Sequence, residues 1–282
     1  MKKIKYLLLT KSVGLFVNLL SFIQPDKANQ LAYKLFSEPR IGRLKNDSLP
    51  KTLKNAVHDT IQFEKHLLQT YIWKGNDNVI LLVHGWESNA SRWKKMLPHL
   101  KKSGSTIVAL DAPAHGLSSG KEFNVPKYAT FINAAVQKYN PKTIIGHSIG
   151  GAASAFYLHK YQNPLMEKVV LLGAPSEMKI IIENYITMLS LNSKIGSFLK
   201  KQSEVKFNIN IDDFSAHKFA EKFNQKAFIA HDIDDKVVVV GEGRKFSKSW
   251  KNVIYVETEG LGHSMHDEEL YQKITRFLFE SE

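Results

Sequence analysis

Residues 144–151 of this chain read IIGHSIGG, and the interpretation of the whole sequence depends on the serine in this stretch. Ser148 follows an apolar run and stands between Gly146 and Gly150 in the pattern G-x-S-x-G. A nucleophilic serine on a sharp strand-to-helix turn needs small neighbours, because side chains at the glycine positions would crowd the backbone. A serine in an ordinary tight turn gives the same pattern. The rest of the chain must therefore supply a base, an acid, an oxyanion site and a scaffold.

The stretch around Ser148 is one unit of a repeated alternation between strands and helices. Apolar runs and alternating patterns predict strands at 66–74, 79–84, 106–111, 143–148, 169–175, 227–232 and 253–258. Helical patterns follow them at 91–104, 126–139, 150–161, 241–250 and 266–279. In the first of these helices Pro98 is expected to introduce a kink. The alternation predicts an α/β protein whose mostly parallel sheet is covered by helices on both faces.

The alternation predicts three ranges: an N-terminal helical extension over 1–45, a core over 46–175 and 226–282, and a helical cap insertion over 176–225. The insertion is inferred because its segment has no buried-strand run, and unstructured loops of this length are uncommon in compact domains. Its apolar residues either line an acyl pocket or pack the cap onto the body. They are Ile180, Ile181, Ile182, Ile186, Met188 and Leu189.

The N-terminal segment, MKKIKYLLLTKSVGLFVNLLSFIQP, predicts an amphipathic helix that ends before Pro25. Lys11, Gly14, Asn18 and Ser21 fall on one stripe of this helix, and large apolar residues cover the remainder. The helix either packs on the core of its own domain or makes peripheral contact with a membrane through residues 4–24. A signal anchor is the third interpretation. We expect a cytoplasmic protein, with membrane association through this helix as the alternative.

Composition narrows the classes of site and partner. The 282 residues include no cysteine, which excludes disulfides, thiolate metal sites and cysteine nucleophiles. The formal net charge is +12, but the lysines are scattered and no zinc-finger spacing, arginine-rich arm or aromatic RNA-binding motif accompanies them. We therefore expect no nucleic-acid partner, no metal and no organic cofactor, and leave the oligomeric state open.

Polar motifs stand where the predicted strands end. HGW begins at His84, DAPAHGLSSG at Asp111, HDIDDKV at His231 and GLGHSM at Gly260. Functional groups in parallel sheets gather at the carboxyl ends of the strands, so we expect these motifs to lie together. Because a helix begins after Ser148, the backbone N–H of Ile149 is expected to face a developing negative charge.

These motifs, in this order around G-x-S-x-G, make residues 66–282 resemble the α/β-hydrolase family. The resemblance implies a nucleophile at Ser148, a base at His263 and an acid at Asp235, two residues before a valine. It also implies Trp86 N–H as the oxyanion donor that acts with Ile149 N–H.

Other polar residues remain as alternatives or as structural residues. Asp232 and Asp234 remain alternatives for the acid, and His266 for the base. The side chain of His147 is expected to point away from the nucleophile. His84 and His115 are expected to brace loops through hydrogen bonds, and Asp111 to shape a turn.

The implied function is that of a carboxylesterase- or lipase-like serine hydrolase. It would cleave a carboxylic ester or thioester of a small, apolar or lipid-like substrate through an acyl-enzyme intermediate. The family's haloalkane dehalogenases and epoxide hydrolases have aspartate at the elbow, so Ser148 argues against both. The alternatives are a C–C bond hydrolase, a haloperoxidase-like enzyme and a catalytically silent membrane-associated binding protein.

Overall fold

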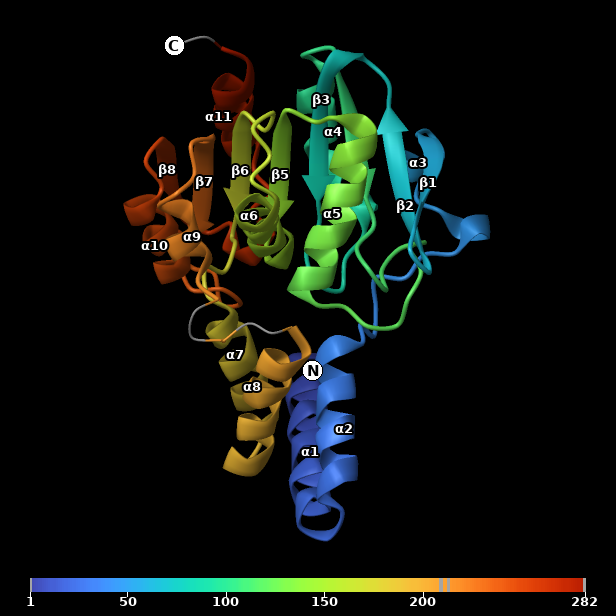
Figure 1. The fold of residues 1–282 in the computed structure, drawn as a ribbon, viewed down its shortest axis with the longest axis vertical. Coiled ribbons are helices and arrows are strands. Elements are labelled where there is room, and N and C mark those ends of the chain that lie inside the picture. Colours follow the sequence, from blue (N-terminus) through green and yellow to red (C-terminus); the bar gives the residue numbers. More distant parts are fainter. Residues whose placement is uncertain (1, 208–209, 212–213, 281–282) are drawn as a thin grey trace. The chain divides into compact units, whose positions relative to one another are not determined.

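The computed structural model of the protein describes residues 2–207, 210–211 and 214–280. The chain divides into two compact units (Figure 1). Met1–Glu38 and Glu177–Ser215 form the helical unit, and Pro39–Ser176 and Ala216–Glu282 form the body. The N-terminal segment and the inserted segment, predicted separately, therefore share one unit. The body includes residues 39–45 and 216–225, which lie inside the ranges predicted for the extension and the cap.

The body is built on an eight-stranded sheet in the order β1-β2-β4-β3-β5-β6-β7-β8. β2 pairs antiparallel with β1 and β4, and all other neighbours in the sheet are parallel. The mostly parallel sheet predicted from the sequence is therefore confirmed. The strands are β1 (Val57–Phe63), β2 (His66–Trp73), β3 (Asn76–Val83), β4 (Ser105–Leu110), β5 (Thr143–His147), β6 (Lys168–Leu172), β7 (Lys226–Asp232) and β8 (Val253–Thr258).

Helices cover both faces of the sheet, as expected from the apolar runs in β3, β5 and β6. Side chains alternate along a strand, so Ile80 and Leu82 contribute to one core together with Trp93, which lies outside the strands. That core also contains apolar residues of α4 (Leu97–Lys101) and α11 (Glu268–Phe279). α5 (Val125–Tyr139) and α6 (Ile149–Tyr161) lie side by side in front of the sheet in Figure 1.

Shorter helices complete the body. They are α3 (Lys51–Lys54), α9 (Ala216–Ala220), α10 (Gly241–Ser249) and the 3-10 turns η1 (Asn46–Ser48), η2 (Ala90–Lys95) and η3 (Gly262–Ser264). The single helix predicted over 91–104 was wrong: η2 and α4 replace it. Pro98 stands in the first turn of α4, where its missing N–H leaves no unsatisfied donor, so the break falls just before it.

The helical unit contains α1 (Lys2–Ile23), α2 (Pro25–Ser37), α7 (Met178–Leu189) and α8 (Ser193–Phe207). α1 ends before Pro25, as predicted, and Pro25 opens α2. Of the apolar residues singled out in the insertion, Ile182 and Leu189 are buried within this structure and the other four are half-buried. Among the described residues, none of the helices combines the length and the apolar character that crossing a membrane requires.

Candidate active site

Ser148 stands between the end of β5 and the first residue of α6, in a backbone conformation that side chains rarely adopt. Its φ is +53° and its ψ is −129°. A non-glycine residue in such a conformation costs about 1–3 kcal/mol and persists only where surrounding contacts fix it. Here the Ser148 N–H donates to the Leu172 carbonyl of β6 at 2.9 Å, and Gly151 N–H donates to the Ser148 carbonyl at 2.8 Å. The turn presents the Ser148 side chain at the carboxyl end of β5.

The two glycines that flank Ser148 are required by close backbone contacts. A Cβ at Gly150 would lie 2.3 Å from the His84 carbonyl oxygen and 2.5 Å from that of Val83. A Cβ at Gly146 would lie 2.7 Å from the Cα of Gly151. All of these contacts are to backbone atoms, which cannot rotate away. The pattern G-x-S-x-G therefore reflects how closely α6 approaches β3 and β5.

Gly150→Ala is expected to lower the free energy of unfolding by roughly 1–3 kcal/mol, because the added methyl overpacks a rigid backbone contact. Urea denaturation followed by circular dichroism measures the loss. Gly241→Ala is the matched control, since a Cβ there meets no atom within 4 Å. Equal stability of the two variants would contradict the backbone explanation.

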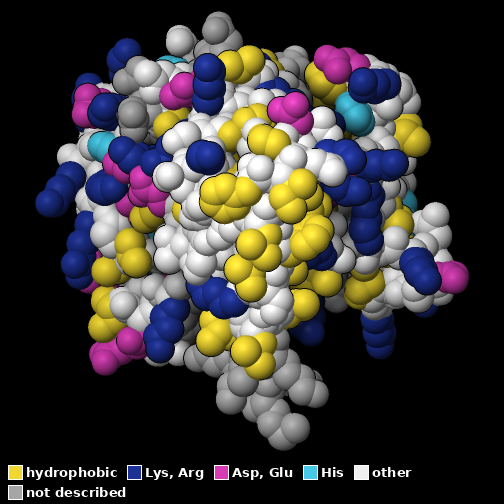
Figure 2. Space-filling model, turned by 90° about the horizontal axis from the view of Figure 1, so that it is seen from below, with side chains coloured by type: hydrophobic (Ala, Val, Ile, Leu, Met, Phe, Trp, Pro, Cys, Tyr) yellow, Lys and Arg dark blue, Asp and Glu magenta, His cyan; other side chains and the backbone are white. Residues whose placement is uncertain are grey.

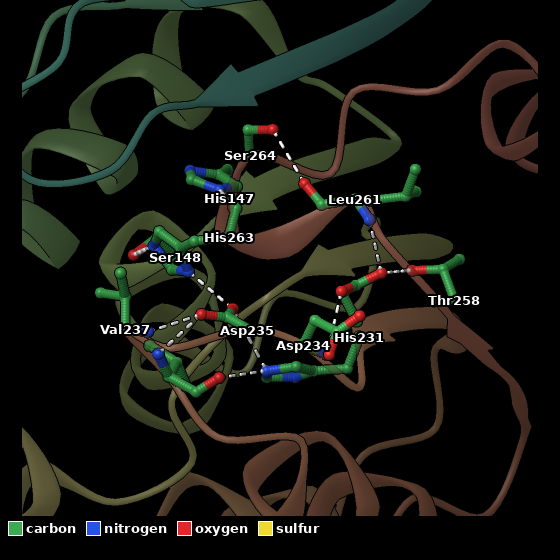
Figure 3. Close-up of polar contacts among 12 residues, drawn as sticks. His147, Ser148, His231, Asp234, Asp235, Val237, Thr258, Leu261, His263 and Ser264 are labelled. Atoms are coloured by element: carbon green, nitrogen blue, oxygen red, sulfur yellow. Dashed lines mark hydrogen bonds and ion pairs between the residues drawn. The ribbon is translucent and has the colours of Figure 1, made fainter.

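Three strand ends bring Ser148, Asp235 and His263 together (Figure 3). His263 lies in η3, after β8, and its Nε2 is 2.8 Å from the Ser148 Oγ. Its Nδ1 is 2.7 Å from the Asp235 Oδ2, in the loop after β7. An ionised carboxylate only accepts hydrogen bonds, so the proton of a neutral His263 lies on Nδ1 and leaves Nε2 free to accept the Ser148 proton.

Asp235 is buried but remains charged. The backbone amides of Val237 and Val238 donate to its Oδ1 at 2.8 and 2.9 Å. The Nε2 of the buried His231 lies 3.6 Å from its Oδ2. Burial alone would raise the pKa of Asp235, but the nearby His231 ring and hydrogen bonds from His263 and the Val238 amide outweigh burial and lower that pKa. The carboxylate next to His263 is therefore ionised at neutral pH.

The alternatives for the acid and the base have other partners. Asp232 accepts hydrogen bonds from the Thr258 hydroxyl at 2.7 Å and from Leu261 N–H at 3.0 Å. Asp234 accepts one from Gly260 N–H at 3.2 Å. His266 Nδ1 pairs with the Tyr271 hydroxyl, and burial lowers the pKa of His266 to about 4. The structure brings none of these three side chains to Ser148.

His147 and Arg92 hold the loop that carries His263, although the sequence did not assign them this role. The side chain of His147 points away from Ser148, and its Nε2–H donates to the His263 carbonyl at 2.7 Å. An Arg92 Nη2–H donates to the carbonyl of Ser264 at 2.8 Å. His147 lies within G-x-S-x-G and His231 begins HDIDDKV, but neither motif indicates what these side chains contact, and Arg92 belongs to no motif. Only the structure identifies the contacts of His147, Arg92 and His231.

The two predicted oxyanion amides belong to Trp86, in the loop after β3, and Ile149, the first residue of α6. Neither amide donates a hydrogen bond within the part of the chain that the structure describes. The His84 Nδ1–H donates to the Gly85 carbonyl at 2.7 Å, and Ala112 N–H donates to the His84 Nε2 at 2.9 Å. The Gly85 C=O and the Trp86 N–H belong to one peptide and point in opposite directions. The hydrogen bond from His84 to the Gly85 carbonyl therefore also fixes the direction of the Trp86 N–H.

Asp111 and His115 stabilise the loops behind this site. Asp111 accepts hydrogen bonds from the amides of Ala90 and Leu117, each at 2.9 Å, and burial raises its pKa. His115 Nδ1–H donates to the Pro113 carbonyl at 2.8 Å, and its Nε2 accepts from Glu87 N–H at 3.0 Å. His115 therefore uses both ring nitrogens in its neutral form.

The stability of the protein is expected to fall as pH decreases. Burial lowers the pKa of His115 from 6.5 to about 4, so the unfolded chain binds more protons between these values. The contribution of neutral, buried His115 to the free energy of unfolding is full above pH 6.5 and is lost as pH falls toward 4. Between pH 7 and pH 5, the expected loss is about 2 kcal/mol. Urea denaturation at the two pH values measures it. His115→Gln should show a smaller difference; an unchanged difference would contradict the assignment.

No group of three or more metal-binding side chains is arranged to hold an ion within residues 2–207, 210–211 and 214–280. The polar side chains at the strand ends are instead joined to one another, as Ser148–His263–Asp235. This arrangement can remove a proton from a serine hydroxyl while two backbone amides remain available for an anionic oxygen.

Comparisons with known proteins identify a matching family model and similar chains. Residues 78–197 match the family model described as alpha/beta hydrolase fold. The human "Serine hydrolase-like protein" is 34% identical over 102 residues, which cover 34% of this chain and 49% of that protein. The "Bifunctional esterase/perhydrolase DCH" of Acinetobacter calcoaceticus is 29% identical over 110 residues, covering 38% of this chain and 40% of that protein. The chain thus spans about half or less of the length of these two relatives.

A solved structure extends the similarity over most of the chain. The bromoperoxidase from Bacillus anthracis superposes with a TM-score of 0.63 at 20% identity, covering 79% of this chain and 99% of that chain. At this identity the superposition shows the fold and leaves the reaction open.

Proposed function

Because this chain belongs to the α/β-hydrolase superfamily, we propose that it is a serine hydrolase that cleaves carboxylic esters or thioesters through an acyl-enzyme intermediate. The observation that carries the proposal is the continuous hydrogen-bonded series Ser148–His263–Asp235, with distances of 2.8 and 2.7 Å. A catalytically silent binding protein would have no need for a strained, correctly paired serine.

In the proposed reaction, His263 Nε2 takes the proton of Ser148 as the Oγ attacks the carbonyl carbon of the substrate. A tetrahedral intermediate forms, and its negative oxygen is bound by the Trp86 and Ile149 amides. His263 then gives its proton to the leaving alcohol or thiol, and the acyl group stays on Ser148. A water molecule, deprotonated by His263, attacks this acyl-enzyme and releases the carboxylic acid.

Electrostatics support these roles. Asp235 stays ionised, so it stabilises the His263 cation that forms in the transition state. Ile149 N–H lies at the positive end of the α6 dipole, where it favours an oxyanion. Each oxyanion donor of this kind contributes about 2.7–4 kcal/mol to transition-state stabilisation.

An aromatic cluster beside the oxyanion loop supports an apolar acyl or alkyl group. Trp86 provides one of the proposed oxyanion amides, and its indole packs edge-on against His115 and Phe123, with ring centroids 5.3 Å apart in both pairs. Phe123 in turn packs against Tyr128 at 5.5 Å. This aromatic cluster next to the oxyanion loop favours an apolar substrate group over a charged one.

Substrate preference is tested with p-nitrophenyl esters of increasing acyl length. We expect kcat/KM to rise about tenfold or more from acetyl to a medium-chain acyl group, because each buried methylene contributes about 0.8 kcal/mol. A fluorophosphonate probe should also label the wild-type chain covalently at Ser148. A preference for acetyl alone would contradict the apolar substrate, whereas absence of both labelling and hydrolysis would contradict the serine hydrolase.

A further inference from the structure

In α1, small and polar residues face the interior of the unit and large apolar residues face outward, the opposite of an ordinary surface helix. Its buried positions are Thr10, Gly14, Val17 and Ser21, which repeat every three or four residues and form one stripe. The opposite side exposes large apolar side chains, including Phe22 at 70% and Ile23 at 76%. We call this side the apolar face of α1; it comprises Leu8, Leu15, Phe16, Leu19, Phe22 and Ile23.

The polar stripe faces inward because it has specific partners in the helical unit. Asn18 donates to the Ser190 carbonyl at 2.8 Å and accepts from Asn192 N–H at 2.8 Å. The Asn192 side chain donates to the Ser21 hydroxyl at 2.9 Å. These bonds fix the rotation of α1 about its axis, so the large apolar residues have no place in the unit's interior.

Gly14 makes the same orientation obligatory. A Cβ at this position would lie only 1.6 Å from the Leu189 carbonyl oxygen at the end of α7. Close approach of two helices at a glycine, with hydrogen-bonded polar side chains beside it, gives a packed interface without large apolar residues. The helical unit therefore keeps the apolar face of α1 on its outside.

The segment that contains α1 is basic in sequence: residues 1–25 include four lysines and no acidic residue. Lys11 belongs to the inward stripe, because its Nζ donates to the Thr187 carbonyl at 3.1 Å and to the Ser190 hydroxyl at 2.7 Å. The Nζ of Lys194, at the start of α8, lies 5.4 Å from the centre of the Phe22 ring. Figure 2 shows hydrophobic side chains gathered near the middle of the view. An apolar strip with basic neighbours matches the interface of a bilayer that carries anionic lipids.

We propose that the apolar face of α1 docks the protein onto an anionic lipid bilayer, with the helix lying in the plane of the interface. The apolar side chains enter the acyl boundary, and the ammonium of Lys194 beside Phe22 faces the headgroup phosphates. A second copy of the chain is a poorer occupant, because two lysine-rich segments would be brought together. Docking depends on the helical unit and not on the reaction proposed for Ser148, so either proposal can fail alone.

Vesicle flotation of the full chain tests the docking. The vesicles are phosphatidylcholine alone and phosphatidylcholine mixed with phosphatidylglycerol. We expect binding to the anionic vesicles, weakened by high salt, and poor binding to the neutral ones. The test variant carries Leu15→Gln, Leu19→Gln and Phe22→Gln, which remove apolar surface from one side of α1 without altering charge or lowering helix propensity. Its partition coefficient should fall by roughly tenfold or more.

Leu165→Gln is the matched control: Leu165 is 63% exposed but lies in the body, and this variant should float as the wild type does. Thermal unfolding and fluorophosphonate labelling of the triple variant should match the wild type. Failure of the wild type to float, or undiminished flotation of the triple variant, would overturn the proposal. So would a lower melting temperature of the triple variant, which would place the face inside the fold, or a dimer that this variant dissociates. Resistance of the bound protein to alkaline carbonate would indicate a spanning helix and would also overturn it.

Discussion

Ser148→Ala is expected to reduce kcat for ester hydrolysis by about 10⁶-fold and to abolish fluorophosphonate labelling. The Ser148 Oγ lies 2.8 Å from His263 Nε2. Among the described residues, no other hydroxyl lies within hydrogen-bond distance of the His263 ring. Without the Ser148 Oγ, His263 has no nucleophile to activate and no acyl-enzyme can form. The Trp86 and Ile149 amides would remain, so a residual rate above that of water alone is expected from oxyanion binding.

Steady-state kinetics and intact-protein mass spectrometry after labelling measure the two effects. Ser154→Ala is the matched control, because Ser154 is buried farther along α6 and its hydroxyl donates to the Gly150 carbonyl at 2.8 Å. That variant should hydrolyse and label as the wild type does. Covalent labelling that persists in Ser148→Ala would place the nucleophile elsewhere.

Asp235→Asn is expected to lower kcat by about 10⁴-fold while leaving the fold intact. The amides of Val237 and Val238 both donate to Oδ1, so the carboxamide oxygen of the new side chain would take that place. Its NH₂ would then occupy the position of Oδ2 and donate to His263 Nδ1. This forces the His263 proton onto Nε2, where the ring can no longer accept a proton from Ser148.

Asp234→Asn is the control for this prediction. Asp234 accepts a hydrogen bond from Gly260 N–H, which an asparagine oxygen can also accept. We expect kcat within roughly threefold of the wild type, since this hydrogen bond is retained. Circular dichroism should show that both variants remain folded. A large loss of activity in Asp234→Asn with little loss in Asp235→Asn would reverse the assignment of the acid.

The fold could be predicted because its signals are local. Apolar runs such as those of β3 and β5 are long enough to identify buried parallel strands, and G-x-S-x-G fixes the turn between β5 and α6. β1, Val57–Phe63, was not predicted, because it is an edge strand whose residues alternate between exposed and half-buried and carry several polar side chains. An edge strand pairs with only one neighbour and is less buried, so it lacks the long apolar run by which a central strand is recognised.

The site could be predicted only as far as the residue types that end each strand. G-x-S-x-G singles out Ser148, whereas the choice of His263 over His266, and of Asp235 among three nearby aspartates, needed a resemblance. In the structure, the Val237 and Val238 amides bind one oxygen of the Asp235 carboxylate, and its other oxygen then faces His263. Contacts such as His147 to the His263 carbonyl join residues far apart in the chain and leave no pattern along it.

The orientation of α1 shows a similar limit. The period of its residues predicts two faces, but it does not indicate which face is buried. Gly14 and Asn18 decide this through their partners near the end of α7, more than 170 residues later in the chain for Asn18. A pattern of polar and apolar residues therefore identifies an amphipathic helix without identifying its environment.

The division of the helical unit into Met1–Glu38 and Glu177–Ser215 has a consequence for synthesis on the ribosome. α1 and α2 emerge first, but α7 and α8, which pack against them, follow only after the first part of the body has been made. At about 5–20 residues per second, this interval lasts on the order of ten to thirty seconds. Throughout this interval, the polar stripe of α1 lacks the partners that the end of α7 and the residues after it supply. A holdase chaperone or a nearby bilayer would have ample time to bind the helix.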